Sequence, residues 1–321
     1  MTLDSTTVSV IVCAYTLERW EGLTRAVRSV QSQRAMPGEV IVVIDHNPDL
    51  LSRARNELSG CLIVENGEGR GLSGARNSGV AAAHGEIVAF MDDDAEADAG
   101  WIGTLTSAFG DGSVVGAGGT IRARWEGGRP TWFPPAFDWV IGCTYEGYPT
   151  EQTPVRNVLG CNMAFRRGPL VSVGGFRREL GRIGTLPVGV EETEVCIRLT
   201  ATHPGTSIVH VPAALVHHTV PRSRATWSYF RRRCFGEGLS KAILSRLVGQ
   251  QDALATERRY VRSVLPRAVM RAVRDAARHR RPGLLVRATA IVAGSAVTAA
   301  GYAWGIVRGR TSVEPAPDRP G

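Results

Sequence analysis

Apolar and polar residues alternate along the first two-thirds of the chain in a pattern that predicts strands and helices in turn. Apolar runs of strand length are separated by segments in which apolar residues recur at helical spacing. The predicted strands are residues 8–14, 39–45, 61–64 and 87–91, and the predicted helices are residues 21–33, 51–58 and 73–83. This repetition predicts an α/β fold whose sheet is mostly parallel and buried on both faces.

The last hundred residues follow a different pattern. Residues 226–281 show helical periodicity, with arginines at most positions outside the apolar face. Residues 288–307 carry no charge and are long enough to cross a bilayer, but their Ala and Gly content also fits a reentrant, interfacial or core helix. The predicted divisions are an α/β domain at 1–225, a basic helical region at 226–283, a hydrophobic helix at 284–310 and a disordered tail at 311–321.

Charge divides along the same boundary. Residues 1–221 hold 18 basic and 24 acidic side chains, whereas residues 222–321 hold 20 basic and 6 acidic ones. The basic part predicts contact with an anionic surface, and without a recognised nucleic-acid module we expect a membrane surface and no nucleic acid. The six cysteines are scattered and form no CxxC pair, and no secretory signal precedes the first strand, so cytosolic thiols are expected.

The predicted strand at 87–91 runs directly into three carboxylates, Asp92, Asp93 and Asp94. Three like charges at one point are costly unless a cation neutralises them, so a divalent-metal site is favoured over a solvated turn. Asp45 also follows a predicted strand. Because ligands of such sheets lie beyond the carboxyl ends of the strands, all four acids are expected at one crevice.

Residues 69–74 satisfy G-x-G-x-x-G, the dinucleotide-binding pattern. A hydride-transferring enzyme is nevertheless disfavoured. The pattern is expected after the first strand, one acid would suffice for a ribose, and a second acidic site follows downstream. That second site is the pair Glu191 and Glu192 at the start of a predicted helix, where acids also serve as ordinary helix caps.

Two further groups leave alternatives open. His217 and His218 follow a predicted strand and are either metal ligands or a core residue beside a surface one. Between residues 110 and 160, aromatic side chains predict either a sugar- or lipid-binding pocket or a satellite core: Trp125, Trp132, Phe133, Phe137 and Trp139.

Taken in order, these motifs resemble family 2 glycosyltransferases of the GT-A fold. The resemblance covers about residues 8–220, and its pieces are 8–15, Asp45, 71–79, 92–94, Gly118-Gly119, 160–167, 174–176, Glu191-Glu192 and His217-His218. Residues 221–242 resemble actinobacterial members, some of which are described as glucosyl-dolichyl-phosphate glucuronosyltransferases.

The resemblance implies inverting sugar transfer from a nucleotide donor, usually a UDP-sugar. It assigns the nucleotide-sugar site to Cys13, Ala14, Tyr15, Asp45, Arg76, Asp92 and Asp93. It implies a Mg²⁺ or Mn²⁺ ion on Asp94, with Asp92, His218 and His217 as further candidate ligands. The general base corresponds to Glu192, where the family has Asp, and Glu191 is the alternative. Candidate acceptor-binding residues are Asn162, Arg231 and Arg232.

The expected acceptor is a glycan or a polyprenyl-phosphate-linked sugar, met at the cytoplasmic face of the cell membrane. Two other classes compete with this interpretation. A nucleotidyltransferase would carry a G-x-G-x-R segment near the first strand, and none is present. A non-catalytic sugar-nucleotide-binding protein on the same fold remains possible because Glu replaces the usual Asp base.

Overall fold

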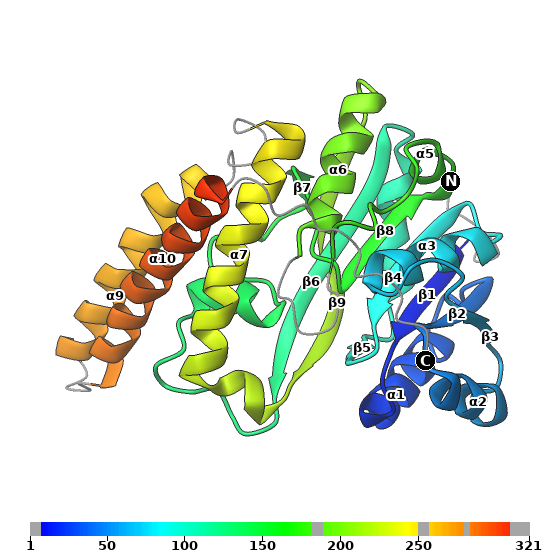
Figure 1. Cartoon of the computed structure of the whole chain (residues 1–321), viewed down its shortest axis with the longest axis horizontal. Helices are drawn as coiled ribbons and strands as arrows, with labels where there is room; N and C mark the ends of the chain where they lie inside the picture. The colour runs from blue at the N-terminus through cyan, green and yellow to red at the C-terminus, as the bar shows by residue number, and fades with distance from the viewer. Residues whose placement is uncertain (1–7, 182–188, 250–256, 279–282, 309–321) are drawn as a thin grey trace.

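Strand and helix alternate at the start of the chain as the hydrophobic pattern predicts. The computed structural model describes residues 8–181, 189–249, 257–278 and 283–308 (Figure 1). The α2 helix begins at Pro48 rather than at residue 51, because Asn47 caps it by accepting a hydrogen bond from the Leu50 amide. The first elements are β1 (Val8–Ala14), α1 (Trp20–Gln31), β2 (Glu39–Ile44), α2 (Pro48–Glu57), β3 (Leu62–Glu65), α3 (Leu72–Ala82) and β4 (Ile87–Asp92).

The sheet is mixed rather than mostly parallel. The later elements are β5 (Ala95–Ala97), α4 (Trp101–Thr106), β6 (Val114–Trp125), β7 (Thr153–Val155), β8 (Asn162–Arg166), α5 (Arg167–Ser172), α6 (Glu191–Thr202) and β9 (Ser207–Val220). The strand order is β3-β2-β1-β4-β8-β6-β9-β5, with β7 paired to β9. The strands β1 to β4 are parallel, but β8 is antiparallel to both of its neighbours, and β5 and β7 are antiparallel to β9.

The parallel strands place their apolar side chains alternately on two faces. Even-numbered residues of β1 pack with α1, α2 and α4, and Ile11 packs on the other face with α3, α5 and α6. The strand order reverses between β1 and β4, where Cys13 lies opposite Asp92 in register. A ligand crevice is expected at the carboxyl ends of strands at such a reversal.

In the part of the chain that the structure describes, three long helices follow the sheet: α7 (Trp227–Val248), α9 (Leu265–Arg278) and α10 (Gly283–Val307), with a short π-helical turn at Tyr260–Val264. They agree with the helical periodicity predicted over 226–281 wherever that segment is described. α7 lies between α10 and the sheet, and α10 packs against both α7 and α9 (Figure 1). The predicted tail at 311–321 lies outside the described residues.

The aromatic segment before β7 packs into the core, as one of the two interpretations predicts, but it is continuous with the main core of the sheet rather than a satellite of it. Phe133 and Phe137 are fully buried. Phe230 of α7 packs against both rings and against Trp132, with ring centroids 5.3–5.6 Å apart. The aromatic segment therefore attaches α7 to the sheet.

Candidate active site

The three acids that follow the apolar part of β4 point to different partners. Asp92 Oδ1 lies 3.7 Å from a guanidinium nitrogen of Arg76. Asp93 Oδ1 accepts a hydrogen bond of 2.9 Å from Arg19. Asp94 turns toward β9 and the turn after it. Arginines thus supply the cationic charge that three adjacent carboxylates require.

Asp94 has the most charged partners. Its Oδ1 is 3.1 Å from Nε2 of His218, and its Oδ2 is 3.2 Å from Arg224 and 3.3 Å from Arg19. Burial opposes its ionisation, but His218 and the two arginines hold the pKa of Asp94 well below its usual range. Asp94 is therefore ionised at neutral pH, as a metal ligand must be.

Asp93 is enclosed, whereas Asp92 is partly exposed. The Asp93 side chain is 4 % exposed, and its Oδ2 has no hydrogen-bond partner among the described residues. Burial and the adjacent carboxylates raise the pKa of Asp93 to about 7 despite Arg19. The Asp92 side chain is 34 % exposed, so it is the more accessible of the two to a ligand.

The donor set fits a divalent cation that a nucleotide helps to hold. Asp94 offers an oxygen, and His218 in its neutral form would offer a nitrogen, with the two atoms 3.1 Å apart. Within the described ranges no group of three or more His, Cys, Asp and Glu side chains converges on a metal position. Two protein donors suffice for Mg²⁺ or Mn²⁺ when diphosphate oxygens and waters complete the shell, but not for an all-protein cage.

The structure does not place His217 with this donor set. Side chains alternate along a strand, so adjacent residues of β9 point to opposite faces. His217 Nε2 lies 3.1 Å from Oδ1 of Asp98, while His218 is buried against Asp94. The expectation that both histidines are candidate ligands is therefore corrected to His218 alone.

Arg76, on α3, connects the acidic run to the glutamate pair. It is 2 % exposed, and its guanidinium donates a hydrogen bond of 2.9 Å to Glu191 Oε1 and one of 3.3 Å to the Gly160 carbonyl. Its guanidinium also lies 5.4 Å from the Phe176 ring centroid. Because Asp92 is on its other side, one buried cation holds β4 and the start of α6 together.

The two glutamates at the start of α6 have different environments. Glu191 is buried against Arg76, and its Oε2 has no partner among the described residues. Glu192 is only partly buried. Desolvation, with the adjacent Glu191 charge adding to it, raises the pKa of Glu192 to about 8. Such a carboxylate is a strong proton acceptor once it is ionised, which for Glu192 occurs near pH 8.

The predicted nucleotide residues gather at the ends of β1 and β2. Tyr15 is 52 % exposed, and the Arg19 guanidinium lies 5.3 Å from its ring centroid. Burial raises the pKa of the Cys13 thiol to about 12, so it stays protonated. Ala14 is buried at the end of β1, and its carbonyl accepts a hydrogen bond from the Asp45 amide.

Asp45 also has a structural task that the sequence did not reveal. Its Oδ2 accepts a hydrogen bond of 2.9 Å from the Gly71 amide, and its Oδ1 accepts one of 2.7 Å from Asn66. Gly71 has a φ of 131°, which favours glycine. The G-x-G-x-x-G segment is thus a short loop that leads into the first turn of α3, and the loop is held against Asp45.

One acceptor prediction is wrong and two stay predictions. Asn162 is fully buried; its amide donates to the Thr120 and Ala214 carbonyls and accepts from Trp101 Nε1, so its polar atoms are occupied within the core. Arg231 and Arg232 are exposed on α7.

Sequence reasoning missed Arg19 and the role of Arg224. Both pair with the acidic run from positions distant in sequence, one beside α1 and one in the turn after β9. The only sequence signals are a basic residue shortly after Tyr15 and the basic segment at 221–224. Neither signal specifies a partner.

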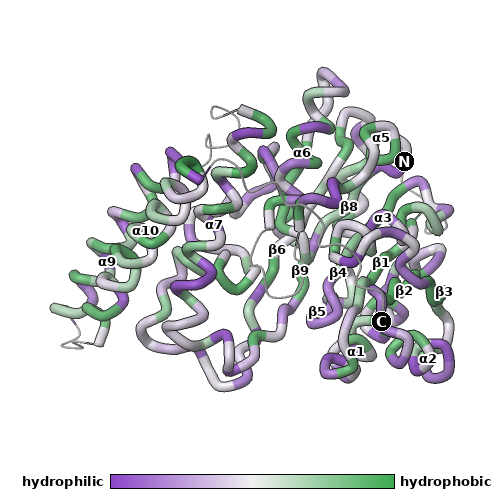
Figure 2. The backbone as a smooth tube through the Cα atoms, in the orientation of Figure 1, coloured by the Kyte–Doolittle hydropathy of each residue, from purple (hydrophilic) through white to green (hydrophobic). Residues whose placement is uncertain are grey.

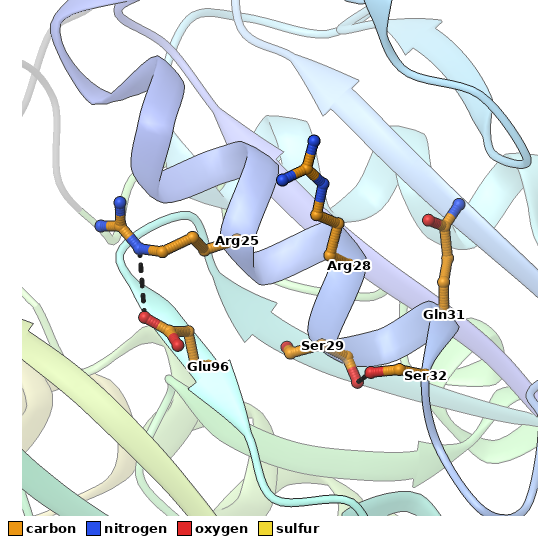
Figure 3. Close-up of a pocket in the computed structure, with 6 residues that line it drawn as sticks. All are labelled: Arg25, Arg28, Ser29, Gln31, Ser32 and Glu96. Carbon is orange, nitrogen blue, oxygen red and sulfur yellow. Dashed lines mark hydrogen bonds and ion pairs between the residues drawn. The ribbon is translucent and has the colours of Figure 1, made fainter.

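A shallow pocket elsewhere shares none of these residues. Figure 3 shows it beside α1, where Arg25 donates a hydrogen bond of 3.2 Å to Glu96 of β5. It is lined by Arg25, Arg28, Ser29, Gln31, Ser32 and Glu96.

Known proteins are similar in sequence to this chain over the candidate site and over most of its length. Residues 9–174 match the family model for glycosyl transferase family 2. The chain is 33 % identical over 247 residues to a glucosyl-dolichyl phosphate glucuronosyltransferase of Haloferax volcanii, an alignment that covers 76 % of this chain and 79 % of the relative.

Solved structures agree in fold. A mannosyltransferase of Pyrobaculum calidifontis, solved with GDP-mannose and Mn²⁺, superposes with a TM-score of 0.57 at 19 % identity, covering 91 % of this chain and 86 % of that one. GalNAc-T7, solved with UDP, GalNAc and Mn²⁺, gives a TM-score of 0.50 at 16 % identity, covering 80 % of this chain and 56 % of that one. The predicted GT-A fold is confirmed.

Proposed function

Because the chain belongs to glycosyl transferase family 2 and is therefore a glycosyltransferase, we propose that it transfers a sugar, with inversion, from a UDP-sugar to a glycan or polyprenyl-phosphate-linked acceptor. The lipid-linked acceptor is favoured by the name of the Haloferax volcanii relative and by the apolar α10 helix. The reaction is placed at the cytoplasmic face of the membrane, where nucleotide sugars are available.

The observation that carries the proposal is the Arg76 bridge. It fixes Glu191, and with it the neighbouring Glu192, relative to the acidic run at the end of β4. Donor binding and proton removal require different carboxylates at the two ends of one crevice. The buried Arg76 side chain keeps these ends in register.

The donor site is assigned as follows. Tyr15 and Asp45 lie at the nucleobase end, and Asp92 is the accessible carboxylate for the ribose. Asp94 and His218 would hold Mg²⁺ or Mn²⁺, which when bound offsets the charge that the diphosphate gains as it leaves. Arg19 and Arg224 add positive charge on the same side of Asp94.

Glu192 is assigned as the general base. The acceptor hydroxyl attacks the anomeric carbon on the face opposite the diphosphate, and its proton passes to the Glu192 carboxylate. The bond to the diphosphate oxygen breaks with its electron pair on the nucleotide. The raised pKa of Glu192 suits this task. Asp93 and Glu191 are assigned positioning roles without direct contact with the substrate, because both side chains are enclosed.

A donor panel tests the proposal. Thermal shifts of the full chain are measured with UDP-, GDP- and dTDP-sugars, with and without Mn²⁺, followed by transfer to a polyprenyl-phosphate-linked sugar. We expect uridine donors to stabilise the protein in a Mn²⁺-dependent way and Asp94→Asn to remove that dependence. Asp98→Asn is the matched control, because Asp98 pairs with the neighbouring His217 outside the site.

Two results would contradict the assignments. Equal Mn²⁺-dependent stabilisation in wild type and Asp94→Asn would reject Asp94 as the ligand. Selective stabilisation by a GDP- or dTDP-sugar would reject uridine as the base of the donor.

A further inference from the structure

The outward face of α10 carries no charge over five turns. In the described part of the chain α10 is the helix long and apolar enough to cross a membrane, and only 22 % of its most apolar window is buried. Its exposed positions between 288 and 307 are Thr289, Val292, Ala296, Ala299, Ala300, Ala303, Trp304, Ile306 and Val307. A water-facing helix surface would normally carry charged side chains there.

The opposite face of α10 is held tightly by α7. A Cβ atom at Gly301 would lie 2.2 Å from the Phe235 carbonyl oxygen, and one at Gly238 would lie 2.1 Å from the Thr298 carbonyl oxygen. A Cβ at Gly305 would meet Ala242 at 2.6 Å. The two backbones are therefore in close contact along the helices, in the manner of small-residue helix pairs.

α7 itself is unsuited to the interior of a bilayer. It carries charged residues along its length, and Ser240 in its second half accepts a hydrogen bond from the Gly189 amide just before α6. Phe230 fixes its first half in the aromatic core. Charged side chains at the centre of a bilayer are expensive. Because α10 is paired with α7 along the length of both helices, α10 cannot cross the membrane unless the charged side chains of α7 also enter the bilayer.

α9 adds an amphipathic face on the other side of α10. Its exposed positions combine arginines with apolar side chains, among them Arg267, Arg274, Met270 (73 % exposed) and Val273 (47 % exposed). At the end of α10, Arg308 lies 4.1 Å from the Trp304 ring centroid. Arginine beside exposed Trp and Met is typical of a helix at the boundary between headgroups and acyl chains.

We propose that α9 and α10 form a monotopic anchor, a helical hairpin that lies in one leaflet of an anionic membrane and does not cross it. The apolar face of α10 enters the acyl region, and the arginines of α9 contact lipid phosphates. The proposal deepens the membrane location given under the proposed function and shares no residue with the proposed active site.

Vesicle flotation tests the anchor. The full chain is mixed with phosphatidylcholine vesicles containing phosphatidylglycerol and centrifuged through a density gradient. Val292→Glu should lower the vesicle-bound fraction about tenfold or more, because it removes an inserted apolar side chain and adds a charge. Val171→Glu is the matched control: Val171 is 53 % exposed on α5 and Val292 is 60 % exposed, so neither change should unfold the protein.

Topology is tested with the same sealed vesicles. A C-terminal epitope tag is exposed to protease from outside and detected by blotting. A monotopic anchor leaves the tag on the same side as the catalytic domain, so it should be digested without detergent. A tag protected until detergent is added would show that α10 crosses the bilayer and would overturn the proposal.

Two other outcomes would also overturn it. Equal flotation of Val292→Glu and wild type would show that the α10 face is not inserted. A lipid-free dimer that Val292→Glu dissociates, with flotation unchanged, would make the face an interface between two copies. Neither result would touch the transferase assignment, because transfer to a detergent-dispersed acceptor is measured separately.

Discussion

At the residue scale, the site separates two adjacent glutamates by environment. Glu191 is paired with a buried arginine, and Glu192 is partly open and difficult to ionise. The proposed general base is Glu192, and the environments of the two side chains give a physical reason to prefer it to Glu191. A carboxylate already neutralised by Arg76 is a poorer proton acceptor than one with few partners.

We expect Glu192→Gln and Glu191→Gln to fail in different ways. Glu192→Gln should lower the rate of transfer about 10²–10⁴-fold without unfolding the protein, because it removes a proton acceptor and keeps the shape. Glu191→Gln should destabilise the fold by about 3–5 kcal/mol, because it removes the nearer of the two carboxylates that neutralise the buried Arg76. Single-turnover transfer rates and denaturant unfolding distinguish them. A stable, inactive Glu191→Gln beside an active Glu192→Gln would reverse the assignment.

The pH dependence should report the same group. Glu192 must be ionised to accept a proton, so kcat/KM should rise about tenfold per pH unit until about pH 8 and then level off. Folding stability should change with pH in the opposite direction to kcat/KM. The folded state retains a proton on Glu192 from about pH 4.3, the unfolded value, to about pH 8, so the contribution of Glu192 to folding falls as pH rises through that window.

Melting curves across this pH range check the stability sign. Glu192→Gln cannot ionise, so it should gain melting temperature over wild type at pH 8 and little at pH 4. Glu192→Asp keeps a carboxylate and should retain part of the activity and of the pH profile. A wild-type rate independent of pH between pH 6 and pH 8 would contradict the proposed base.

At the element scale, α7 joins the catalytic sheet to the C-terminal helices. A charged cluster helps to attach it: Glu257 accepts two hydrogen bonds of 2.9 Å from Arg156 and lies 2.7 Å from Lys241 of α7. Neighbouring cations hold the pKa of Glu257 at about 2 against its burial. The Gly contacts then fix α10 on the far side of α7.

The close α7–α10 contact predicts that a large side chain on α10 destabilises the protein only at positions that face α7. Gly301→Leu should separate the helices, because its Cβ alone would lie 2.2 Å from the Phe235 carbonyl oxygen. The expected cost is about 1–3 kcal/mol of unfolding free energy, or local release of α10. Ala300→Leu is the control, since Ala300 is exposed on the same helix. Proteolysis and chemical unfolding provide the measurement, and equal behaviour of the two variants would argue against tight pairing.

At the scale of the whole molecule, charge and apolar surface are divided between the two ends. The strands β1 to β3 lie at one end, and α9 and α10 lie at the other (Figure 1). Along the outer helices, hydrophobic and hydrophilic positions lie close together (Figure 2). The donor crevice and the basic, apolar end are thus carried by separate elements.

Membrane association should therefore depend on lipid charge without being abolished by salt. Arginines near an anionic surface contribute about 1 kcal/mol each, and salt screens this term but not apolar burial. Arg267→Glu should weaken flotation with anionic vesicles about tenfold and barely change it with neutral ones. Arg55→Glu, an exposed position on α2, is the control. Complete release of wild type by high salt would show that charge alone holds the protein.

The sequence by itself determined the alternation of β1 to β4 with their helices, because hydrophobic periodicity is local. It also determined the acids at the carboxyl ends of β2 and β4, the glutamate pair at the start of α6 and the uncharged stretch inside α10. Each of these follows from the order and type of neighbouring residues. The resemblance in motif order was enough to predict the family and the GT-A fold.

Only the tertiary structure decided which charges meet. Arg19 reaches Asp93 across 74 positions of the chain and Arg76 reaches Glu191 across 115, distances over which no periodicity carries information. The same limit explains why Asn162 proved to be a core residue and why β8 is antiparallel. Pairing across a sheet depends on strands far apart in sequence, and the burial that fixes a side chain's role is a property of all its neighbours together.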